Sequence, residues 1–146
     1  MKVLVQRSKE SSVSIENKLV NKIDHGLVLL VGFTKGDSVS DIEKLAKKVV
    51  NLRIFDDESG VMNKSILEVG GEILSISQFT LYASTKKGNR PSYIEALNGE
   101  EAIKLYERFN EELNKYIVTK PGIFGADMKV CITNDGPITI MLESGL

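Results

Sequence analysis

The segment from Gly26 to Phe33 constrains the fold most, because it contains the longest unbroken aliphatic run of the chain, Leu27 to Val31. A short run of this kind, bounded by turn residues, is typical of a strand that is buried on both faces. It is far shorter than a membrane span, which takes about 20 apolar residues, and no membrane association is expected. Three further strands are predicted before it, at Lys2–Arg7, Val13–Ile15 and Lys18–Ile23.

Two amphipathic helices are predicted where the hydrophobic period changes from that of a strand to that of a helix. The first is expected from Ser40 to about Arg53, with Ser40 and Glu43 as a capping box. The second is expected to begin at Asn98, with Glu101 completing its cap. The predicted buried faces consist of Ile42, Leu45, Ala46, Val49 and Leu52 in the first helix, and of Ala102, Leu105, Tyr106, Phe109 and Leu113 in the second.

The second half of the chain adds three predicted strands, Glu72–Leu81, Met128–Thr133 and Ile138–Leu142, with Asn134–Pro137 as the turn between the last two. About eight strands and two helices, joined by links of hairpin length, favour antiparallel sheets covered by helices over βαβ winding. No internal repeat or linker interrupts the pattern. The expectation is an α+β fold in which residues 1–146 form a single domain.

Composition excludes several classes of function. The single histidine, His25, and the single cysteine, Cys131, are too few for a structural zinc site, which takes four nitrogen or sulfur donors. No metal and no cofactor are expected. The formal net charge of −1 lacks the basic excess of proteins that bind nucleic acid over their whole surface, so any RNA contact must be local. Met1–Arg7 is predicted to be a strand and not a signal peptide, and a cytoplasmic location is expected.

Two segments carry polar or conformationally special residues where a core strand would simply continue. In Ser75–Leu81, which ends with the motif Ser77–Leu81, an apolar strand ends in hydroxyl and amide side chains just before the basic loop Ser84–Arg90. Taken alone, this segment also fits an ordinary edge strand. The second segment, Asn134–Thr139, fits an ordinary hairpin turn. A proline that opens the last strand is, however, also a position where a cis peptide bond can be fixed.

Together, the two segments resemble the two characteristic motifs of the D-aminoacyl-tRNA deacylase family, in the same order and at a similar separation. The resemblance covers essentially the whole chain. It extends to Gln6-Arg7, Leu52–Phe55, Met62-Asn63, Lys87–Ser92 and Phe124–Met128. The departures from the family pattern are small and fall outside the two motifs: Ser8 replaces an apolar residue, and Asn89 and Tyr93 vary the basic loop.

The resemblance implies a small α+β domain of two packed, mainly antiparallel sheets with helices, which works as a homodimer. It also implies an esterase that releases D-amino acids, and glycine, from the 3′ end of tRNA. By resemblance, the catalytic residues are Phe79 and Thr80, and the substrate-binding residues are Ser77, Gln78, Gly136 and Pro137. In the family the Gly-Pro bond is cis and reaches into the pocket of the other subunit.

The residue types of the first motif leave the mechanism open. A Thr80 nucleophile would normally require an adjacent base, and the motif contains neither histidine nor carboxylate. We therefore prefer a site of main-chain groups, in which the N–H groups of Phe79 and Thr80 stabilise the oxyanion and the 2′-hydroxyl of the terminal adenosine assists the attack. Gln78 is expected to position the adenosine, and Phe79 either joins the core or stacks on the base.

Two other functions remain open on the sequence alone. One is a noncatalytic module that binds a D-amino acid or a nucleotide end, and the other is a Thr80-dependent hydrolase of free D-amino acid esters. Lys86, Lys87 and Arg90 form a local basic cluster, which is either a solvated loop or a contact to tRNA phosphates. His25 lies in a predicted turn far from both motifs and is interpreted as structural or exposed.

Overall fold

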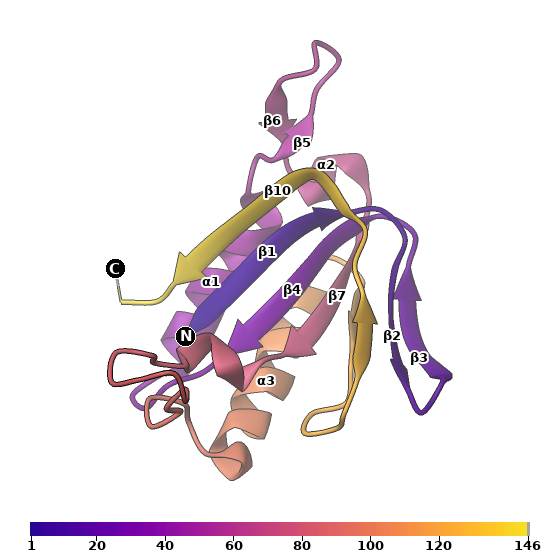
Figure 1. Ribbon diagram of the computed structural model, residues 1–146. Helices are drawn as coiled ribbons and strands as arrows, with labels where there is room; N and C mark the ends of the chain where they lie inside the picture. The colour runs from indigo at the N-terminus through magenta and orange to yellow at the C-terminus, as the bar shows by residue number, and fades with distance from the viewer. Residues whose placement is uncertain (146) are drawn as a thin grey trace.

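The aliphatic run forms strand β4 (Gly26–Gly32), the central strand of a five-stranded sheet in the order β10-β1-β4-β7-β8 (Figure 1). β1 (Lys2–Ser8) pairs antiparallel with β4 and with β10 (Asn134–Glu143). β7 (Glu72–Ser77) runs parallel to β4, and β8 (Thr119–Pro121) runs parallel to β7. The sheet is therefore antiparallel on one side of β4 and parallel on the other.

The computed structural model describes residues 1–145, and it places helices in the two connections between parallel strands. α1 (Val39–Asn51) lies between β4 and β7, and α3 (Gly99–Asn114) lies between β7 and β8. Mainly antiparallel sheets covered by helices are confirmed, yet the disfavoured βαβ connection occurs twice. The preference against βαβ winding was based on links of hairpin length, which join the strands of the first third of the chain. Parallel strands are joined by a long crossover instead, so those short links do not reveal how the later strands are connected. The first connection also contains β5 (Phe55–Asp56), β6 (Met62–Lys64) and α2 (Ile66–Val69).

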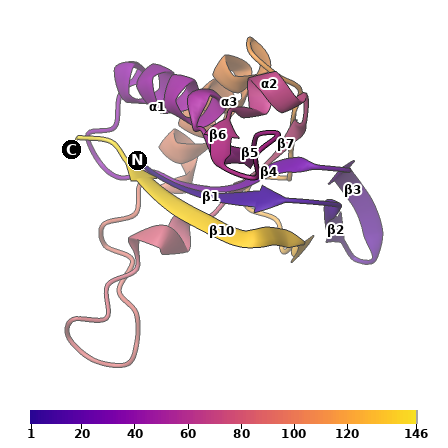
Figure 2. The same ribbon diagram turned by 90° about the horizontal axis from the view of Figure 1, so that it is seen from above.

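A second sheet of three antiparallel strands consists of β2 (Ser11–Ile15), β3 (Lys18–Ile23) and β9 (Lys129–Cys131). It packs against one face of the five-stranded sheet. The buried side chains between the two sheets are those of Val13, Ile23, Val28, Leu74 and Ile76. On the opposite face, α1 and α3 lie side by side over the larger core (Figure 2). β4 is therefore buried on both faces, as its composition predicted.

The three-stranded sheet covers only part of its face of the larger sheet. Over β1 and β10 that face has no covering layer among the described residues except at the Lys2 end, where the Lys2 ammonium donates to the Leu81 carbonyl of the 3-10 helix η1 (Phe79–Tyr82) over 3.3 Å (Figure 2). Because side chains alternate along a strand, Val3 and Val5 point toward the helices while Leu4 and Gln6 point to the open face. The Gln6 side chain donates a hydrogen bond to Thr139 of β10 there, over 3.2 Å, and Met141 is 43% exposed. Beyond its Lys2 end, one face of the β1/β10 pair is thus left without a covering layer.

The two long helices occur where they were predicted, with one change at a terminus. α3 is capped as expected, since the Asn98 side chain accepts a hydrogen bond from the main-chain N–H of Glu101 over 3.0 Å. α1 begins earlier than expected, and its capping box consists of Ser38 and Asp41 rather than beginning at Ser40. Ser38 and Asp41 have the same spacing as Ser40 and Glu43, and spacing alone does not decide which pair forms the capping box.

Both strands that carry the candidate motifs differ from their predicted extent. β7 ends at Ser77, and the chain continues as the 3-10 helix η1 (Phe79–Tyr82) instead of extended strand. Asn134–Pro137, the predicted turn, is the first part of β10, where Asn134 pairs with Ser8 beyond an irregularity in the register. Such an irregularity places an extra residue in one strand, so residues typical of turns can occur within a sheet.

Candidate active site

The first motif lies at the end of β7, where the chain leaves the sheet. The main-chain N–H of Gln78 donates to the carbonyl of Val31 over 2.7 Å, which extends the parallel pairing with β4 by one residue. The chain then turns into η1, which rests directly against β4. This close approach requires Gly32, because a Cβ atom there would lie 2.9 Å from the Gln78 carbonyl oxygen and 3.3 Å from the Cβ of Leu81. Gly32 therefore sets the position of the whole motif.

Two main-chain donors of the motif are left without an acceptor. The N–H groups of Phe79 and Thr80, at the start of η1, donate no hydrogen bond to any acceptor in the described part of the chain. The side-chain amide of Gln78 donates to the Thr80 hydroxyl oxygen over 2.5 Å. No carboxylate or imidazole among residues 1–145 is hydrogen-bonded to that hydroxyl. Thr80 thus has an orienting partner but no base, whereas the main chain offers two donors.

Two cavities meet at this motif, and both are lined by Ser77, Phe79 and Phe124. The smaller one, about 210 Å³, extends toward α3 and is mainly apolar. Its other lining residues are Val31, Gly32, Phe33, Leu97, Gly99 and Ala102. The larger one, about 300 Å³, extends toward the segment before β9. Its other lining residues are Ile76, Gln78, Gly125, Ala126, Asp127, Met128 and Val130.

Two aromatic side chains, Phe79 and Phe124, line both cavities. Phe79 is 54% exposed and its ring packs edge-on against Tyr93, with 5.1 Å between the ring centroids, so it is not a core residue. Phe124 packs against Tyr106 of α3, whose hydroxyl donates to the Ser75 carbonyl over 2.6 Å. Burial raises the pKa of Tyr106, which keeps this donor protonated. Through Tyr106, the wall that contains Phe124 is tied to β7 near Ser77.

The second motif lies at the far end of the sheet. The Gly136–Pro137 peptide bond is cis, as the family resemblance implied. β10 is separated from β7 by β1 and β4, which corresponds to about 14 Å across the strands. The pairing also places Pro137 near the end of the sheet where β7 begins, whereas Ser77 lies at the opposite end. A single chain therefore does not bring Gly136 and Pro137 to the two cavities.

A buried arginine holds the second motif. Arg7 is 8% exposed, and its Nε lies 3.3 Å from the carbonyl oxygen and 3.2 Å from a carboxylate oxygen of Asp135. Its Nη1 donates to the Ile54 carbonyl over 3.0 Å. A Cβ atom at Gly136 would lie 2.9 Å from the Cγ1 of Ile138 and 3.2 Å from the Nη2 of Arg7. The main chain at Gly136 is thus fixed in a position that accepts no larger residue without movement.

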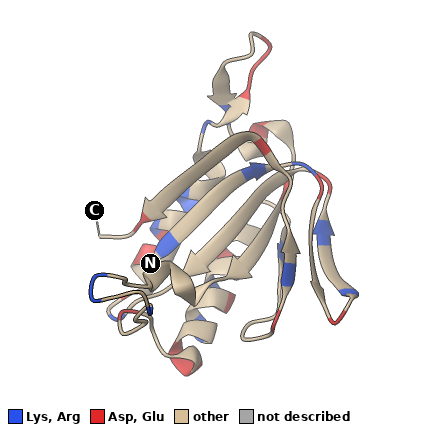
Figure 3. Cartoon of the chain, in the orientation of Figure 1, with Lys and Arg blue, Asp and Glu red and all other residues tan. Residues whose placement is uncertain are grey.

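The basic cluster lies on an exposed loop between η1 and α3 (Figure 3). Lys86, Lys87 and Arg90 line a groove of about 790 Å³ and form no ion pair within residues 1–145. The loop is closed by reciprocal hydrogen bonds between the main chains of Ser84 and Ser92, each of 2.8 Å. His25 is exposed at the far end of the sheet, as interpreted from the sequence.

Sequence reasoning assigned no role in the site to several residues that shape it, namely Arg7, Gly32, Ala102, Phe124 and Met128, although all but Gly32 were named as core residues or within segments that carry the resemblance. Only Gly32 carried a signal that sequence reasoning could have used, because a glycine at the end of an aliphatic strand often marks the close approach of another main chain.

None of the helices in residues 1–145 combines the length and the apolar character needed to cross a membrane. The same residues contain no group of three or more metal-binding side chains.

Comparison with known proteins identifies the relatives of this chain. The model of the D-Tyr-tRNA(Tyr) deacylase family matches residues 4–143. Proteins named D-aminoacyl-tRNA deacylase from Bacteroides thetaiotaomicron and Clostridium novyi are 57% and 54% identical, and each match covers 99% of this chain and 97% of the relative.

Two solved structures are similar to this chain in fold over nearly its whole length. The structure of a protein named c-Myc DNA Unwinding Element Binding Protein has a TM-score of 0.95 at 41% identity and covers 100% of both chains. A probable eukaryotic D-amino acid tRNA deacylase has a TM-score of 0.82 over 97% of both chains, and at 16% identity it supports the fold alone. By the family match and these relatives, the chain belongs to the D-Tyr-tRNA(Tyr) deacylase family.

Proposed function

We propose that the protein hydrolyses the ester bond between a D-amino acid, or glycine, and the 3′-terminal adenosine of tRNA. The observation that carries this proposal is that the main-chain N–H groups of Phe79, which lines both cavities, and of Thr80, the next residue, donate to no acceptor within residues 1–145. The smaller, apolar cavity accepts the adenine base, and the larger one accepts the aminoacyl group. Full-length relatives named D-aminoacyl-tRNA deacylase support the same substrate class.

The proposed chemistry uses main-chain groups in place of a catalytic side chain. Water attacks the ester carbonyl, and the oxyanion of the tetrahedral intermediate accepts hydrogen bonds from Phe79 and Thr80. The 2′-hydroxyl of the terminal adenosine assists the attack, and the 3′-oxygen then leaves with a proton. Gln78 holds the Thr80 side chain and borders the aminoacyl cavity.

Thr80→Ala is expected to reduce the single-turnover deacylation rate by less than about tenfold, because the main-chain donors survive the substitution. Loss of a true nucleophile costs several orders of magnitude. Thr80→Ser serves as the matched control, since it retains the hydroxyl. A collapse to the background rate in Thr80→Ala, with activity retained in Thr80→Ser, would contradict the main-chain mechanism and make Thr80 the nucleophile.

The site is proposed to be completed by a second copy of the chain. Gly136 and Pro137 lie far from the cavities of their own chain, and beyond its Lys2 end the face formed by β1 and β10 has no covering layer among the described residues. That face carries Leu4 and Met141. A homodimer that pairs these open faces brings the Gly136-Pro137 element of each subunit to the aminoacyl cavity of the other.

The cytoplasmic location of the protein, which was expected from the sequence, stays a prediction.

The exposed loop is proposed to contact tRNA phosphates, since Lys86, Lys87 and Arg90 are free of ion pairs within residues 1–145. Replacing all three by alanine is expected to weaken tRNA binding and to lower the slope of log affinity against log salt by about one unit per lost contact. The rate at saturating tRNA should hardly change. Filter binding at several salt concentrations measures both quantities.

The matched control for the loop is the triple alanine variant of Lys44, Lys47 and Lys48, three exposed lysines of α1. It removes the same charge from a surface remote from the motif. An unaltered affinity and slope in the loop variant, or an equal loss in the control, would show that the loop is merely solvated.

Two other functions are distinguished by one pair of assays with D-tyrosyl-tRNA and D-tyrosine methyl ester. The proposed enzyme hydrolyses the tRNA ester. Hydrolysis of the methyl ester alone would favour a Thr80-dependent hydrolase of free esters. Hydrolysis of neither substrate would favour a noncatalytic binding module.

A further inference from the structure

Two neighbouring residues of the large sheet lie next to the 3-10 helix η1. Gly32 of β4 and Lys2 of β1 are direct partners in the antiparallel pairing of these strands. Cross-strand partners point to the same face of a sheet. At Gly32 that face is occupied by η1, because an added Cβ atom would lie 2.9 Å from the Gln78 carbonyl oxygen. The Lys2 side chain therefore extends beside η1, whereas Gly32 lies directly under it.

Lys2 contacts the C-terminal end of η1 in two ways. Its ammonium donates a hydrogen bond to the Leu81 carbonyl oxygen over 3.3 Å and lies 4.7 Å from the centre of the Tyr82 ring. A cation at this distance is attracted to the face of an aromatic ring. Within residues 1–145 the Leu81 carbonyl accepts no main-chain hydrogen bond, and the ammonium donates no other one. Glu143, the partner of Lys2 in β10, forms no ion pair with it. The contacts of the Lys2 ammonium are thus directed to η1.

We propose that Lys2 is a positioning residue of the active site, which holds η1 at its C-terminal end and thereby fixes the main-chain donors at its start. The proposal rests on the proposed function, in which the N–H groups of Phe79 and Thr80 stabilise the oxyanion. η1 contains four residues, which at about 2.0 Å per residue separate its ends by only about 8 Å. The Ala83 N–H donates to the Thr80 carbonyl over 3.0 Å. A shift of the C-terminal end is therefore passed directly to Thr80.

The alternative role for Lys2 is a contact with a tRNA phosphate, since it lines the groove of the basic loop together with Lys86 and Arg90. A phosphate contact contributes to tRNA affinity and depends on salt. A positioning contact contributes to the rate of the bound complex instead. The contacts with Leu81 and Tyr82 are made without any tRNA, which favours the positioning role.

The test uses Lys2→Met, which keeps an unbranched side chain and removes its charge, and Lys2→Arg, which restores a cation that donates hydrogen bonds and stacks on rings. Single-turnover measurements over a range of enzyme concentrations separate the rate constant of bound D-alanyl-tRNA from its apparent affinity. Lys2→Met is expected to lower the rate constant about tenfold, the effect of losing one hydrogen bond from a charged group, and to change the affinity by less than about twofold. Lys2→Arg should recover the rate constant to within about threefold.

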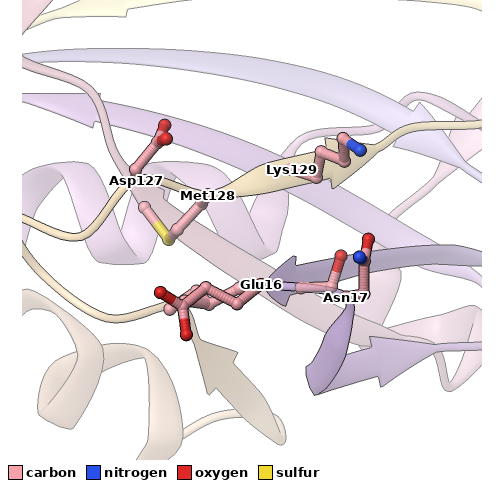
Figure 4. Close-up of a pocket in the computed structure, with 7 residues that line it drawn as sticks. Glu16, Asn17, Asp127, Met128 and Lys129 are labelled. Carbon is pink, nitrogen blue, oxygen red and sulfur yellow. The ribbon is translucent and has the colours of Figure 1, made fainter.

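A second measurement reports on η1 without any reaction. The N–H groups of Leu81 and Ala83 donate to carbonyls within the motif, and their hydrogen exchange is expected to be about tenfold faster in Lys2→Met. The matched control is Lys129→Met, which removes the same charge from an exposed strand residue. Lys129 lines a cavity of about 490 Å³ between the β2–β3 turn and β9, to which η1 contributes no residue (Figure 4). This control should leave the rate constant and the exchange unaltered.

An unaltered rate constant in Lys2→Met overturns the positioning role, and so does an equal loss in Lys129→Met. A loss confined to the affinity and its salt dependence would assign Lys2 to phosphate binding instead. If the unmodified protein does not hydrolyse D-alanyl-tRNA, the proposed function fails, and hydrogen exchange alone then tests the contact with η1. Exchange of Leu81 and Ala83 that is equal in Lys2→Met and the unmodified protein would show that Lys2 does not hold η1.

Discussion

Glycyl-tRNA is expected to be hydrolysed while L-alanyl-tRNA is spared, with single-turnover rates that differ by at least about 100-fold, or ~2.7 kcal/mol in activation free energy. A pocket that accepts many D-amino acids cannot select by tight binding of the side chain. The economical alternative fixes the amino group and the ester, and fills the direction of an L side chain. The main chain at Gly136 and Pro137 suits this role, because glycine allows close approach and the proline ring limits motion.

Rejection by this element is steric and begins at the Cβ atom, so glycine cannot be rejected. The measurement compares glycyl-, L-alanyl- and D-alanyl-tRNA side by side, and D-alanyl-tRNA is expected to be hydrolysed. If glycyl-tRNA is protected as well as L-alanyl-tRNA, selection depends on positive recognition of a D side chain. The steric role of Gly136 and Pro137 would then have to be abandoned.

Gly32→Ala is expected to lower the single-turnover rate on D-alanyl-tRNA by about 100-fold, since a misplacement of about 1 Å at a reacting group can cost that much. The added Cβ atom would lie 2.9 Å from the Gln78 carbonyl oxygen and 3.4 Å from a ring carbon of Tyr82. A main-chain carbonyl cannot rotate away, so η1 must move, and its N–H donors move with it.

The control for Gly32→Ala must lose stability without moving η1. Val49→Ala meets this need, because Val49 is fully buried in the core under α1 and loses apolar contacts when shortened. Thermal unfolding is used to confirm that both variants are folded at the assay temperature. Full activity in Gly32→Ala, or an equal loss in Val49→Ala, would show that the position of η1 is not critical.

Periodic segments of the fold could be predicted, and segments without a period could not. The aliphatic strand β4 and the amphipathic helices α1 and α3 follow from hydrophobic spacing, which is a strong local signal. The end of β7 at Ser77 was missed because Gln78 and Thr80 fit an edge strand as well as a turn. The parallel pairing of β7 was missed because it depends on the crossover through α1, which leaves no trace in the sequence of β7 itself.

The candidate site was predictable only through resemblance. Its motif residues were named in the sequence, but nothing local shows that Gly136 and Pro137 lie at the opposite end of the sheet from Ser77. That separation is a property of strand order. Because the two motifs lie apart within one chain, a site that contains both requires two subunits.

Heterodimers test the central claim, that each site joins the cavities of one subunit to the Gly136-Pro137 element of the other. One subunit carries Gly32→Ala, which disables its cavities. The other carries Gly136→Ala, in which the new Cβ atom would lie 2.9 Å from the Cγ1 of Ile138, with φ at 123°. The two chains carry different affinity tags, so that the mixed dimer is purified free of either homodimer.

In such a heterodimer one site combines both lesions and the other combines none. The account predicts that it hydrolyses D-alanyl-tRNA at about half the rate of the unmodified dimer and rejects L-alanyl-tRNA as the unmodified protein does. If each chain instead completes its own site, every site contains one lesion. The heterodimer would then behave as the average of the two variant homodimers, and that result would contradict the account.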